Sequence, residues 1–179
     1  MANDPAASPA PWVARFAPLA APGGHVLDLA CGGGRHGRLF LGRGHPVCFL
    51  DIDMTGVADL AGQPQAELKP ADLEHAPWPF ASQEDKGGRQ FDVIVVVNYL
   101  WRPLFPQLVA ALAPTGLLLY ETFMQGHERV GRPTNPDYLL APDELFERLK
   151  GACDILAFEQ GWQETPNPAM RQRICARKR

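Results

Sequence analysis

The chain is predicted to form a single α/β domain whose sheet is doubly wound, with helices on both faces. Three observations support this prediction. Short apolar runs alternate with helix-like stretches along most of the 179 residues. The run FDVIVVV at 91–97 is almost unbroken and rich in β-branched residues, which is typical of a strand buried on both faces of a parallel sheet. The last two runs, at 154–160 and 171–176, have no helix between them, which favours antiparallel pairing.

The sheet is expected to contain about seven strands, mostly parallel with an antiparallel last strand, in a Rossmann-like arrangement. The strands are predicted at residues 25–30, 46–51, 67–71, 91–97, 117–123, 154–160 and 171–176. Helices are predicted at residues 35–43, 55–61, 104–112 and 142–149. Thr55 is the expected N-cap of the second helix, and Pro142 suits the first turn of the fourth.

Two segments lie outside these elements. Residues 1–11, MANDPAASPAP, are rich in Ala and Pro and are expected to form a flexible arm before the domain at 12–179. Residues 124–141 are rich in Gly, Pro, Asn and Arg and show no clear periodicity. Long loops without secondary structure of their own are often functional, so this segment is expected to form a lid over a site.

The composition indicates an ordinary globular protein, with 46% of residues hydrophobic and 21% charged. A net charge of -3 does not favour binding to nucleic acid or to an anionic membrane surface. No apolar stretch is long enough to span a membrane, and the first residues lack the features of a secretion signal, so the expected location is the cytoplasm. The four cysteines are far apart and form no zinc-binding spacing, so no metal site is expected.

A cluster of glycines follows the first predicted strand, in LDLACGGGRHGRLF at 27–40. Gly32–Gly34 allow a tight turn and close approach of a ligand to the backbone at the carboxyl edge of the sheet. The segment from Gly32 to Gly37 matches the G-x-G-x-x-G spacing of dinucleotide sites. Asp28 disfavours that interpretation, because a carboxylate near a pyrophosphate repels it, whereas one near an α-ammonium group attracts it. The alternative for Asp28 is that it caps a turn.

Acidic residues also follow the next two predicted strands. Asp51 ends the second strand, where its carboxylate can accept both hydroxyls of a ribose, and Asp53 is the alternative at this position. A ribose is present both in a dinucleotide and in an adenosine linked to an amino acid, so Asp51 does not distinguish these two kinds of ligand. Asp72 follows the third strand, where a carboxylate can accept the amino group of adenine while Leu73 covers the ring. Dinucleotide sites do not regularly use that position, so the pattern favours an adenosine linked to an amino acid.

Four segments, VLDLACGGGRHG, CFLDID, ADLE and FDVIVVVNYL, resemble in order and spacing the class I S-adenosylmethionine-dependent methyltransferases. The resemblance covers about residues 24–179 and includes the antiparallel last strand of that family. The first motif of the family is an acid followed by small residues at alternate positions, here Asp28, Ala30, Gly32 and Gly34. Ala30 departs from the usual glycine but is small. The nearest subgroup is the small bacterial proteins similar to tellurite-resistance methyltransferases.

The resemblance implies that S-adenosylmethionine is the cofactor. The backbone at 30–34 is expected to hold its methionine part, with Arg35 paired to the methionine carboxylate. Asn98 and Tyr99, just past the fourth strand, are expected to face the sulfonium. The alternative for Arg35 and His36 is that they are plain surface residues.

The nucleoside part is expected to bind to the next two strands, with the ribose on Asp51 and the adenine on Asp72 and Leu73. The full set of expected cofactor-binding residues is Asp28, Ala30, Cys31, Gly32, Gly34, Arg35, Asp51, Ile52, Asp72, Leu73, Asn98 and Tyr99.

Candidates on the acceptor side lie at the same edge of the sheet. Tyr99, Arg102 and Glu121 are the candidate catalytic residues, with Glu121 as a base or as a group that orients a cationic substrate. The alternative for Glu121 is an ion pair with Arg102 or Arg132. His127, in the predicted lid, is either a base or a solvated loop residue.

The leading hypothesis is methyl transfer to a small-molecule acceptor by in-line displacement at the sulfonium methyl, which requires alignment of a nucleophile and exclusion of water. Asn98 is not followed by the two prolines and aromatic residue often found in enzymes that methylate amide or base nitrogens, so that substrate class is disfavoured. Two alternatives stay open. One is an NAD-dependent oxidoreductase, on the glycine spacing and Asp51, and the other is a non-catalytic S-adenosylmethionine-binding module.

Overall fold

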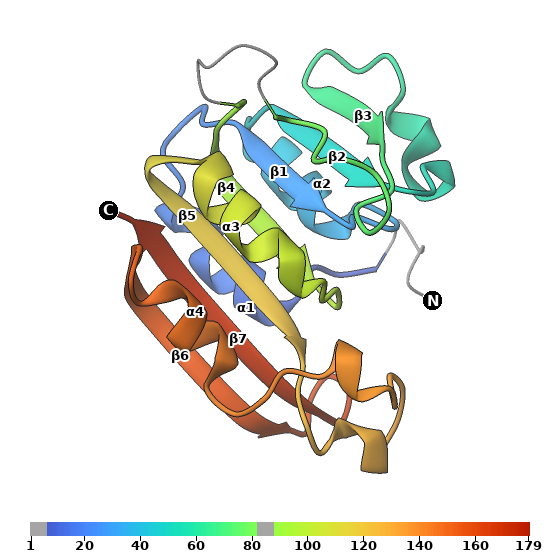
Figure 1. Cartoon of the computed structure of the whole chain (residues 1–179). Coiled ribbons are helices and arrows are strands. Elements are labelled where there is room, and N and C mark those ends of the chain that lie inside the picture. Colours follow the sequence, from blue (N-terminus) through green and yellow to red (C-terminus); the bar gives the residue numbers. More distant parts are fainter. Residues whose placement is uncertain (1–6, 82–87) are drawn as a thin grey trace.

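The computed structural model describes residues 7–81 and 88–179, and these form one sheet in the order β3-β2-β1-β4-β5-β7-β6 (Figure 1). The strands are β1 Val26–Leu29, β2 Val47–Asp51, β3 Ala66–Pro70, β4 Phe91–Val97, β5 Leu112–Phe123, β6 Cys153–Gln163 and β7 Ala169–Lys178. The α-helices are α1 Pro11–Phe16, α2 Arg35–Leu41, α3 Phe105–Ala111 and α4 Glu144–Leu149. Short 3-10 helices lie at η1 Ala17–Leu19, η2 Thr55–Leu60, η3 Arg102–Leu104, η4 His127–Arg129 and η5 Pro136–Tyr138.

The pairing of the strands confirms the predicted fold class. β1 pairs parallel to β2 and β4, β2 to β3, and β4 to β5. β7 runs antiparallel to both β5 and β6 and forms the hairpin expected at this edge of the sheet. β2 and β3 extend outward from β1 in one direction and β5 follows β4 in the other, so the order reverses between β1 and β4. Open α/β sheets bind their ligands at the carboxyl ends of the strands at this point.

Helices cover both faces of the sheet, as predicted (Figure 1). On one face, Val26 and Val93 of the sheet pack in a cluster with Trp12 of α1 and Phe40 of α2. On the other face, residues such as Ile94 and Leu118 pack with residues of α3 and α4. In the central strands β1 and β4, the side chains on both faces of the sheet are buried. This explains why these strands are continuous apolar runs in the sequence.

The short helix α1 was not expected from the sequence. Pro11 occupies its first turn, and Trp12 is buried and donates a hydrogen bond from Nε1 to the Ile174 carbonyl at 3.2 Å. Its six residues are too few to show a helical period. Of the predicted flexible arm at 1–11, residues 1–6 lie outside the described residues, whereas Ala10 is buried in the sheet-facing cluster.

Three predicted elements differ in detail. The segment beginning at Thr55 is a 3-10 helix, and no side chain caps it. α4 begins at Glu144, after Asp143 in a left-handed conformation (φ 60°), so Pro142 precedes the helix instead of lying in its first turn. β5 begins directly after α3 and contains a register irregularity near Thr115, whose φ is 61°. Two of these differences coincide with a residue in the left-handed region, Asp143 before α4 and Thr115 in β5. None of the described helices has the length and apolar character needed to cross a membrane.

Candidate functional site

In the glycine loop between β1 and α2, every second residue from 30 to 34 has a left-handed backbone conformation. Ala30, Gly32 and Gly34 have positive φ angles of 53°, 54° and 70°. A side chain at Gly34 would place its Cβ 2.5 Å from Cγ1 of Val57, so only glycine fits there. The backbone N–H groups of this loop bond within the protein: Cys31 donates to the Leu50 carbonyl at 3.1 Å, Gly32 to the Asp51 carboxylate at 2.9 Å and Gly34 to the Cys31 carbonyl at 2.8 Å. These bonds hold the loop against β2 at the carboxyl edge of the sheet, and its role as a backbone cradle for a ligand stays a prediction.

The structure explains why glycine is usual at the position of Ala30. The expectation from the sequence was that a small side chain suffices there, but the φ of 53° lies in the left-handed region that L-residues avoid. The requirement is therefore for backbone conformation and not for size. Ala30 carries local strain at the wall of the site, where it lines a cavity.

Asp28 is buried beneath the loop and does not line the cavities described below. Its Oδ2 accepts a hydrogen bond at 2.7 Å from the backbone N–H of Gly37, a donor in the first turn of α2 that has no partner within the helix. Burial raises the pKa of Asp28 to about 7, although the Gly37 hydrogen bond lowers it. This geometry favours the turn-capping alternative and makes Asp28 a residue that fixes the loop to the helix.

Asp51 connects β2 to the glycine loop. Its Oδ2 accepts from the N–H of Gly32 at 2.9 Å, and its Oδ1 accepts from the N–H of Asp53 at 3.1 Å. Asp53 is exposed and its Oδ1 accepts from the N–H of Thr55. Asp51 lines two cavities at the carboxyl edge of the sheet, whereas Asp53 lines neither. The choice of Asp51 over Asp53 for ribose binding is therefore consistent with this placement.

A first cavity of about 430 Å³ lies beside the ends of β2 and β3. Ile52, Leu73 and Tyr99 provide its apolar walls, and Ile52 is 69% exposed although it is a large apolar side chain. Asp72 also lines it, and Oδ1 of Asp72 accepts from the backbone N–H groups of Glu74 and His75. These backbone hydrogen bonds lower the pKa of Asp72. The carboxylates of Asp51 and Glu74 also line this slot, and its apolar sides together with an acceptor carboxylate suit a flat ring that carries an amino group.

A second, larger cavity of about 710 Å³ extends from the glycine loop across the ends of β4 and β5. The loop contributes Cys31, Gly32 and Arg35 to its wall. The other side is formed by the 124–141 segment, by the turn at 166–168 between β6 and β7, and by residues 8–11 before α1. The Arg35 guanidinium lines the cavity and donates to the Ser8 carbonyl at 3.2 Å. Three segments distant in the sequence therefore enclose one volume large enough for a small-molecule ligand.

His36 and Cys31 are buried side chains of the same wall. Burial lowers the pKa of His36 to about 3, with Arg35 adding to the effect, so this imidazole is neutral near pH 7. Burial raises the pKa of the Cys31 thiol, and the carboxylates of Asp28 and Asp51 raise it further. The alternative in which His36 is a surface residue is wrong, because its side chain is 5% exposed.

Glu121, Asn98 and Arg171 meet on the far side of this cavity. Nη1 of Arg171 lies 3.3 Å from Oε1 of Glu121 and donates to Oδ1 of Asn98 at 2.7 Å. The side chains of Glu121 and Arg171 are only 6% and 11% exposed. The expected ion pair of Glu121 with Arg102 or Arg132 is therefore wrong, since Arg171 on β7 is the partner. Sequence reasoning missed Arg171, because only the pairing of β7 with β5 brings it to this edge.

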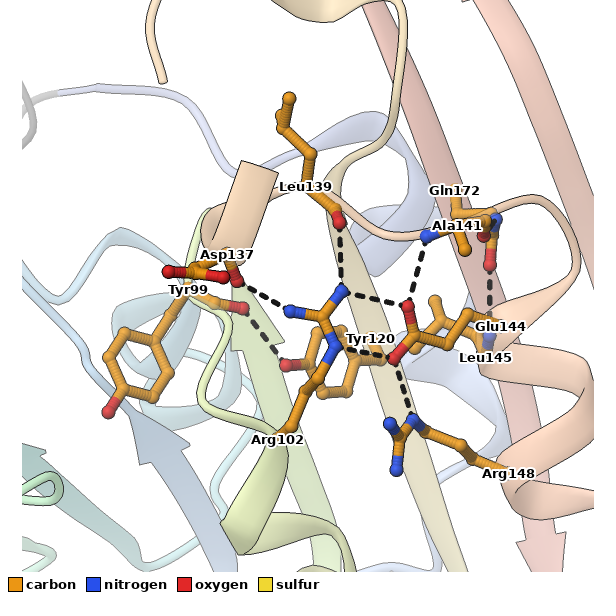
Figure 2. Close-up of polar contacts among 10 residues, drawn as sticks. All are labelled: Tyr99, Arg102, Tyr120, Asp137, Leu139, Ala141, Glu144, Leu145, Arg148 and Gln172. Carbon is orange, nitrogen blue, oxygen red and sulfur yellow. Dashed lines mark hydrogen bonds and ion pairs between the residues drawn. The ribbon is translucent and has the colours of Figure 1, made fainter. Parts of the chain in front are cut away.

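Arg102 lines neither of the two cavities, and its guanidinium bonds to one carboxylate and two backbone carbonyls (Figure 2). It forms a bidentate ion pair with Glu144, in which Nε and Nη2 lie 2.8 and 2.9 Å from the carboxylate oxygens. It also donates to the carbonyls of Asp137 and Leu139 in the 124–141 segment. Arg148 donates to the same Glu144 carboxylate. This placement does not support Arg102 as a catalytic candidate, and it shows how the 124–141 segment is fastened to α4.

His127 is buried in the wall of the larger cavity, so neither alternative from the sequence describes it. Its Nε2 lies 2.9 Å from the Arg132 carbonyl, which can only accept, while its Nδ1 accepts from the N–H of Met170 at 3.4 Å. The ring also stacks on Phe123, with centroids 4.2 Å apart. Both nitrogens are occupied by the backbone, so His127 holds the 124–141 segment in place.

Tyr99 stands between the two cavities and lines both. Its hydroxyl is buried, and no residue in the described part of the chain accepts or donates a hydrogen bond there. Burial raises the pKa of Tyr99, and the nearby carboxylates of Glu74 and Asp72 raise it further. The phenol is therefore protonated at neutral pH, which disfavours Tyr99 as a base.

Comparison with solved structures identifies the fold. No protein-family model and no curated protein sequence matches the chain. The structure is similar to TehB from Haemophilus influenzae, with a TM-score of 0.72, 21% identity and coverage of 93% of this chain. The chain spans 61% of the length of that protein.

Two further neighbours are described as methyltransferases. The S-adenosylmethionine-dependent methyltransferase from Methanosarcina mazei gives a TM-score of 0.70 at 17% identity, covering 96% of this chain and 99% of the other. The second is the 1,6-didemethyltoxoflavin-N1-methyltransferase from Burkholderia thailandensis with bound 1,6-didemethyltoxoflavin and S-adenosylhomocysteine. It gives a TM-score of 0.67 at 19% identity, and the match covers 94% of this chain and 76% of the other. These similarities confirm, at the level of the fold, the resemblance seen in the sequence. The chain has the fold of S-adenosylmethionine-dependent methyltransferases.

Proposed function

We propose that this protein is an S-adenosylmethionine-dependent methyltransferase that acts on a small molecule. The observation that carries the proposal is the alternating left-handed backbone at Ala30, Gly32 and Gly34, joined to Asp51 at the edge where the strand order reverses. The fold of the neighbours supports the same conclusion, since several are methyltransferases and two contain S-adenosylhomocysteine.

The two cavities fit the parts of S-adenosylmethionine. The backbone cradle at 30–34 and Arg35 would hold the methionine end in the larger cavity, and Asp51 at the junction would accept the ribose hydroxyls. Ile52, Leu73 and Asp72 would enclose the adenine in the smaller cavity. When bound, S-adenosylmethionine supplies a methyl group on a positively charged sulfur, which leaves with the electrons of the broken C–S bond as S-adenosylhomocysteine.

The chain itself would position the acceptor and exclude water. Asn98 and Tyr99 follow β4 between the proposed cofactor site and the rest of the larger cavity, so the acceptor would approach past them. Glu121 is the carboxylate in that part of the wall and would take the proton of a nucleophile that arrives protonated. The 124–141 segment and the 166–168 turn cover the cavity from the opposite side, which limits access of water.

Turnover of S-adenosylmethionine tests this proposal. The protein is incubated with S-adenosylmethionine and a panel of small acceptors, and both S-adenosylhomocysteine and the methylated product are quantified by mass spectrometry. We expect formation of equal amounts of both with at least one acceptor, and loss of that turnover in Asp51→Ala. Binding of S-adenosylhomocysteine without turnover on any acceptor would instead indicate a non-catalytic binding module.

A further inference from the structure

The acceptor half of the larger cavity contains a buried arginine whose donors are only partly used. Arg171 bonds to Asn98 through Nη1, and the same atom faces Glu121. Its Nε is buried, and no residue in the described ranges 7–81 and 88–179 accepts a hydrogen bond from it. Leaving a charged donor buried without an acceptor is unfavourable, so the site is more stable when an oxygen reaches this guanidinium.

The orientation of this guanidinium is fixed by its neighbours. Its Cζ lies 4.3 Å from the centroid of the Phe123 ring, so one face of the planar group is covered by an aromatic side chain. His127 stacks on the same ring, and the ion pair with Glu121 holds the side chain from β5. A planar guanidinium held in this way presents parallel N–H donors along its edge, the arrangement that matches a carboxylate.

The charges of the cavity wall also favour an anion on this side. Arg132 of the 124–141 segment and Arg171 both line the acceptor half, where Glu121 is the acidic residue. Asp51, the other acid of the wall, lies at the glycine loop, where its carboxylate bonds to Gly32. Arg171 therefore borders the proposed cofactor site through its bond to Asn98 and lies beside Glu121 on the acceptor side.

An aromatic-walled pocket adjoins this part of the cavity. It has a volume of about 250 Å³ and shares Asn98, Tyr99 and Phe123 with the larger cavity. Tyr138 and Pro133 of the 124–141 segment also line it, and Glu74, Leu100 and Thr122 complete its wall. Because His127 and Arg171 already lie over the Phe123 ring, Tyr99, Tyr138 and Pro133 are the lining groups left to pack against a flat ring.

We propose that the methyl acceptor is a ring compound that carries a carboxylate, with the ring in the pocket lined by Tyr99, Pro133 and Tyr138 and the carboxylate on Arg171. This inference rests on the proposed methyltransferase function, because it assigns the acceptor half of the same cavity. In this arrangement Asn98 and Tyr99, which separate the ring pocket from the glycine loop, lie next to the atom that receives the methyl group.

The inference is tested with three probes of similar shape and different charge. Benzoate, benzamide and benzylamine are titrated against protein saturated with S-adenosylhomocysteine, and binding is measured by ligand-detected NMR. We expect benzoate to bind at least ten times more tightly than the neutral amide, and benzylamine to bind no better than the amide. Tighter binding of benzylamine would show that Glu121 selects a cation and would overturn the inference, as would equal binding of all three.

Two variants with matched chemistry locate the contact. Arg171→Lys keeps the charge but loses the planar edge, and we expect it to lose the preference for benzoate while its affinity for S-adenosylhomocysteine changes less than threefold. Arg173→Lys is the control, because Arg173 lies on the same strand and does not line the cavities. Unchanged benzoate binding in Arg171→Lys would contradict the assignment of the carboxylate to Arg171. Failure of the wild type to bind S-adenosylhomocysteine would instead refute the proposed function.

Discussion

Asp51 and Gly32 are joined by a hydrogen bond of 2.9 Å, in which the backbone N–H of the glycine loop donates to the carboxylate at the end of β2. The bond fixes the loop relative to the second strand and leaves Asp51 in the walls of both cavities. A single residue therefore connects the proposed methionine, ribose and adenine sites.

The first prediction concerns this connection. Asp51→Asn removes the charge that strengthens the bonds from the loop and from a ribose, so we expect S-adenosylhomocysteine to bind at least about tenfold more weakly, equivalent to about 1.4 kcal/mol. Asp53→Asn is the matched control, since Asp53 is exposed and lines neither cavity. Calorimetric titration of both variants checks the prediction, and equal affinities would show that Asp51 has no special role.

The second prediction uses the buried carboxyl of Asp28, whose pKa is raised from 3.8 to about 7 mainly by burial. A raised folded-state pKa contributes stability that is fully present below pH 3.8 and is lost as the pH rises through about 7. Asp28→Asn keeps an oxygen that can accept from Gly37 and removes the titration. Between pH 5 and pH 8 we expect the wild type to lose stability relative to this variant, by at most roughly 3 kcal/mol.

Urea unfolding of both proteins at the two pH values measures this difference. Other titrating groups, including His36, are common to the two proteins and cancel in the comparison. Curves of stability against pH that run parallel for the two proteins would refute the burial argument.

The third prediction concerns the strain at Ala30, whose φ is 53°. Ala30→Gly removes the steric conflict of a left-handed alanine but increases the entropy of the unfolded chain, so we expect a net stabilisation of about 0.5 kcal/mol. Ala110→Gly, at an exposed position of α3, is expected to destabilise by about 0.5–1 kcal/mol. Thermal or urea unfolding distinguishes the two. Destabilisation of similar size at both positions would contradict the left-handed assignment.

The fourth prediction concerns the attachment of the 124–141 segment by Arg102 and Glu144 (Figure 2). Burial raises the pKa of Glu144, but hydrogen bonds from Arg102, from the Ala141 N–H and from Arg148 outweigh it and lower the pKa to about 2. Arg102→Met removes the main partner of a carboxylate whose side chain is 11% exposed, and we expect a loss of roughly 2 kcal/mol.

The same variant should also be cut faster by protease within 124–141, because the two carbonyls bound by Arg102 lose their donor. Lys150→Met is the control, since it breaks the exposed Lys150–Glu147 pair and is expected to change stability by less than about 0.5 kcal/mol. Similar proteolysis rates for the wild type and Arg102→Met would show that the ion pair does not hold the segment.

The parts of the site that the sequence predicts are those encoded locally. The glycine loop and Asp51 lie directly beside two strong apolar runs, so their place at the sheet edge follows from the run that precedes them. Arg171 and Arg102 act through partners 73 and 42 residues away in the chain. Their roles depend on the register of β7 against β5 and on the path of the 124–141 segment, which neither composition nor spacing determines.

Other differences between expectation and structure have a similar origin. Asp28 has the sequence context of a ligand-binding acid, but its side chain points to the helix that packs on β1, where it bonds to Gly37. Ala30 has a size that suits the motif, whereas its backbone conformation is the property that matters. His127 lies in a loop with polar composition, yet the fold buries it against Phe123. The role of each residue therefore depends on backbone geometry and packing that the type of residue does not determine.

Calorimetric titration with S-adenosylhomocysteine, with NADH titrated in parallel, tests the central claim most directly. The claim is that the cradle at 30–34 and the carboxylate of Asp51 hold an adenosyl amino acid and not a dinucleotide. We predict one-to-one binding of S-adenosylhomocysteine and no binding of NADH. Binding of NADH without binding of S-adenosylhomocysteine would contradict the claim and assign the glycine loop to phosphates.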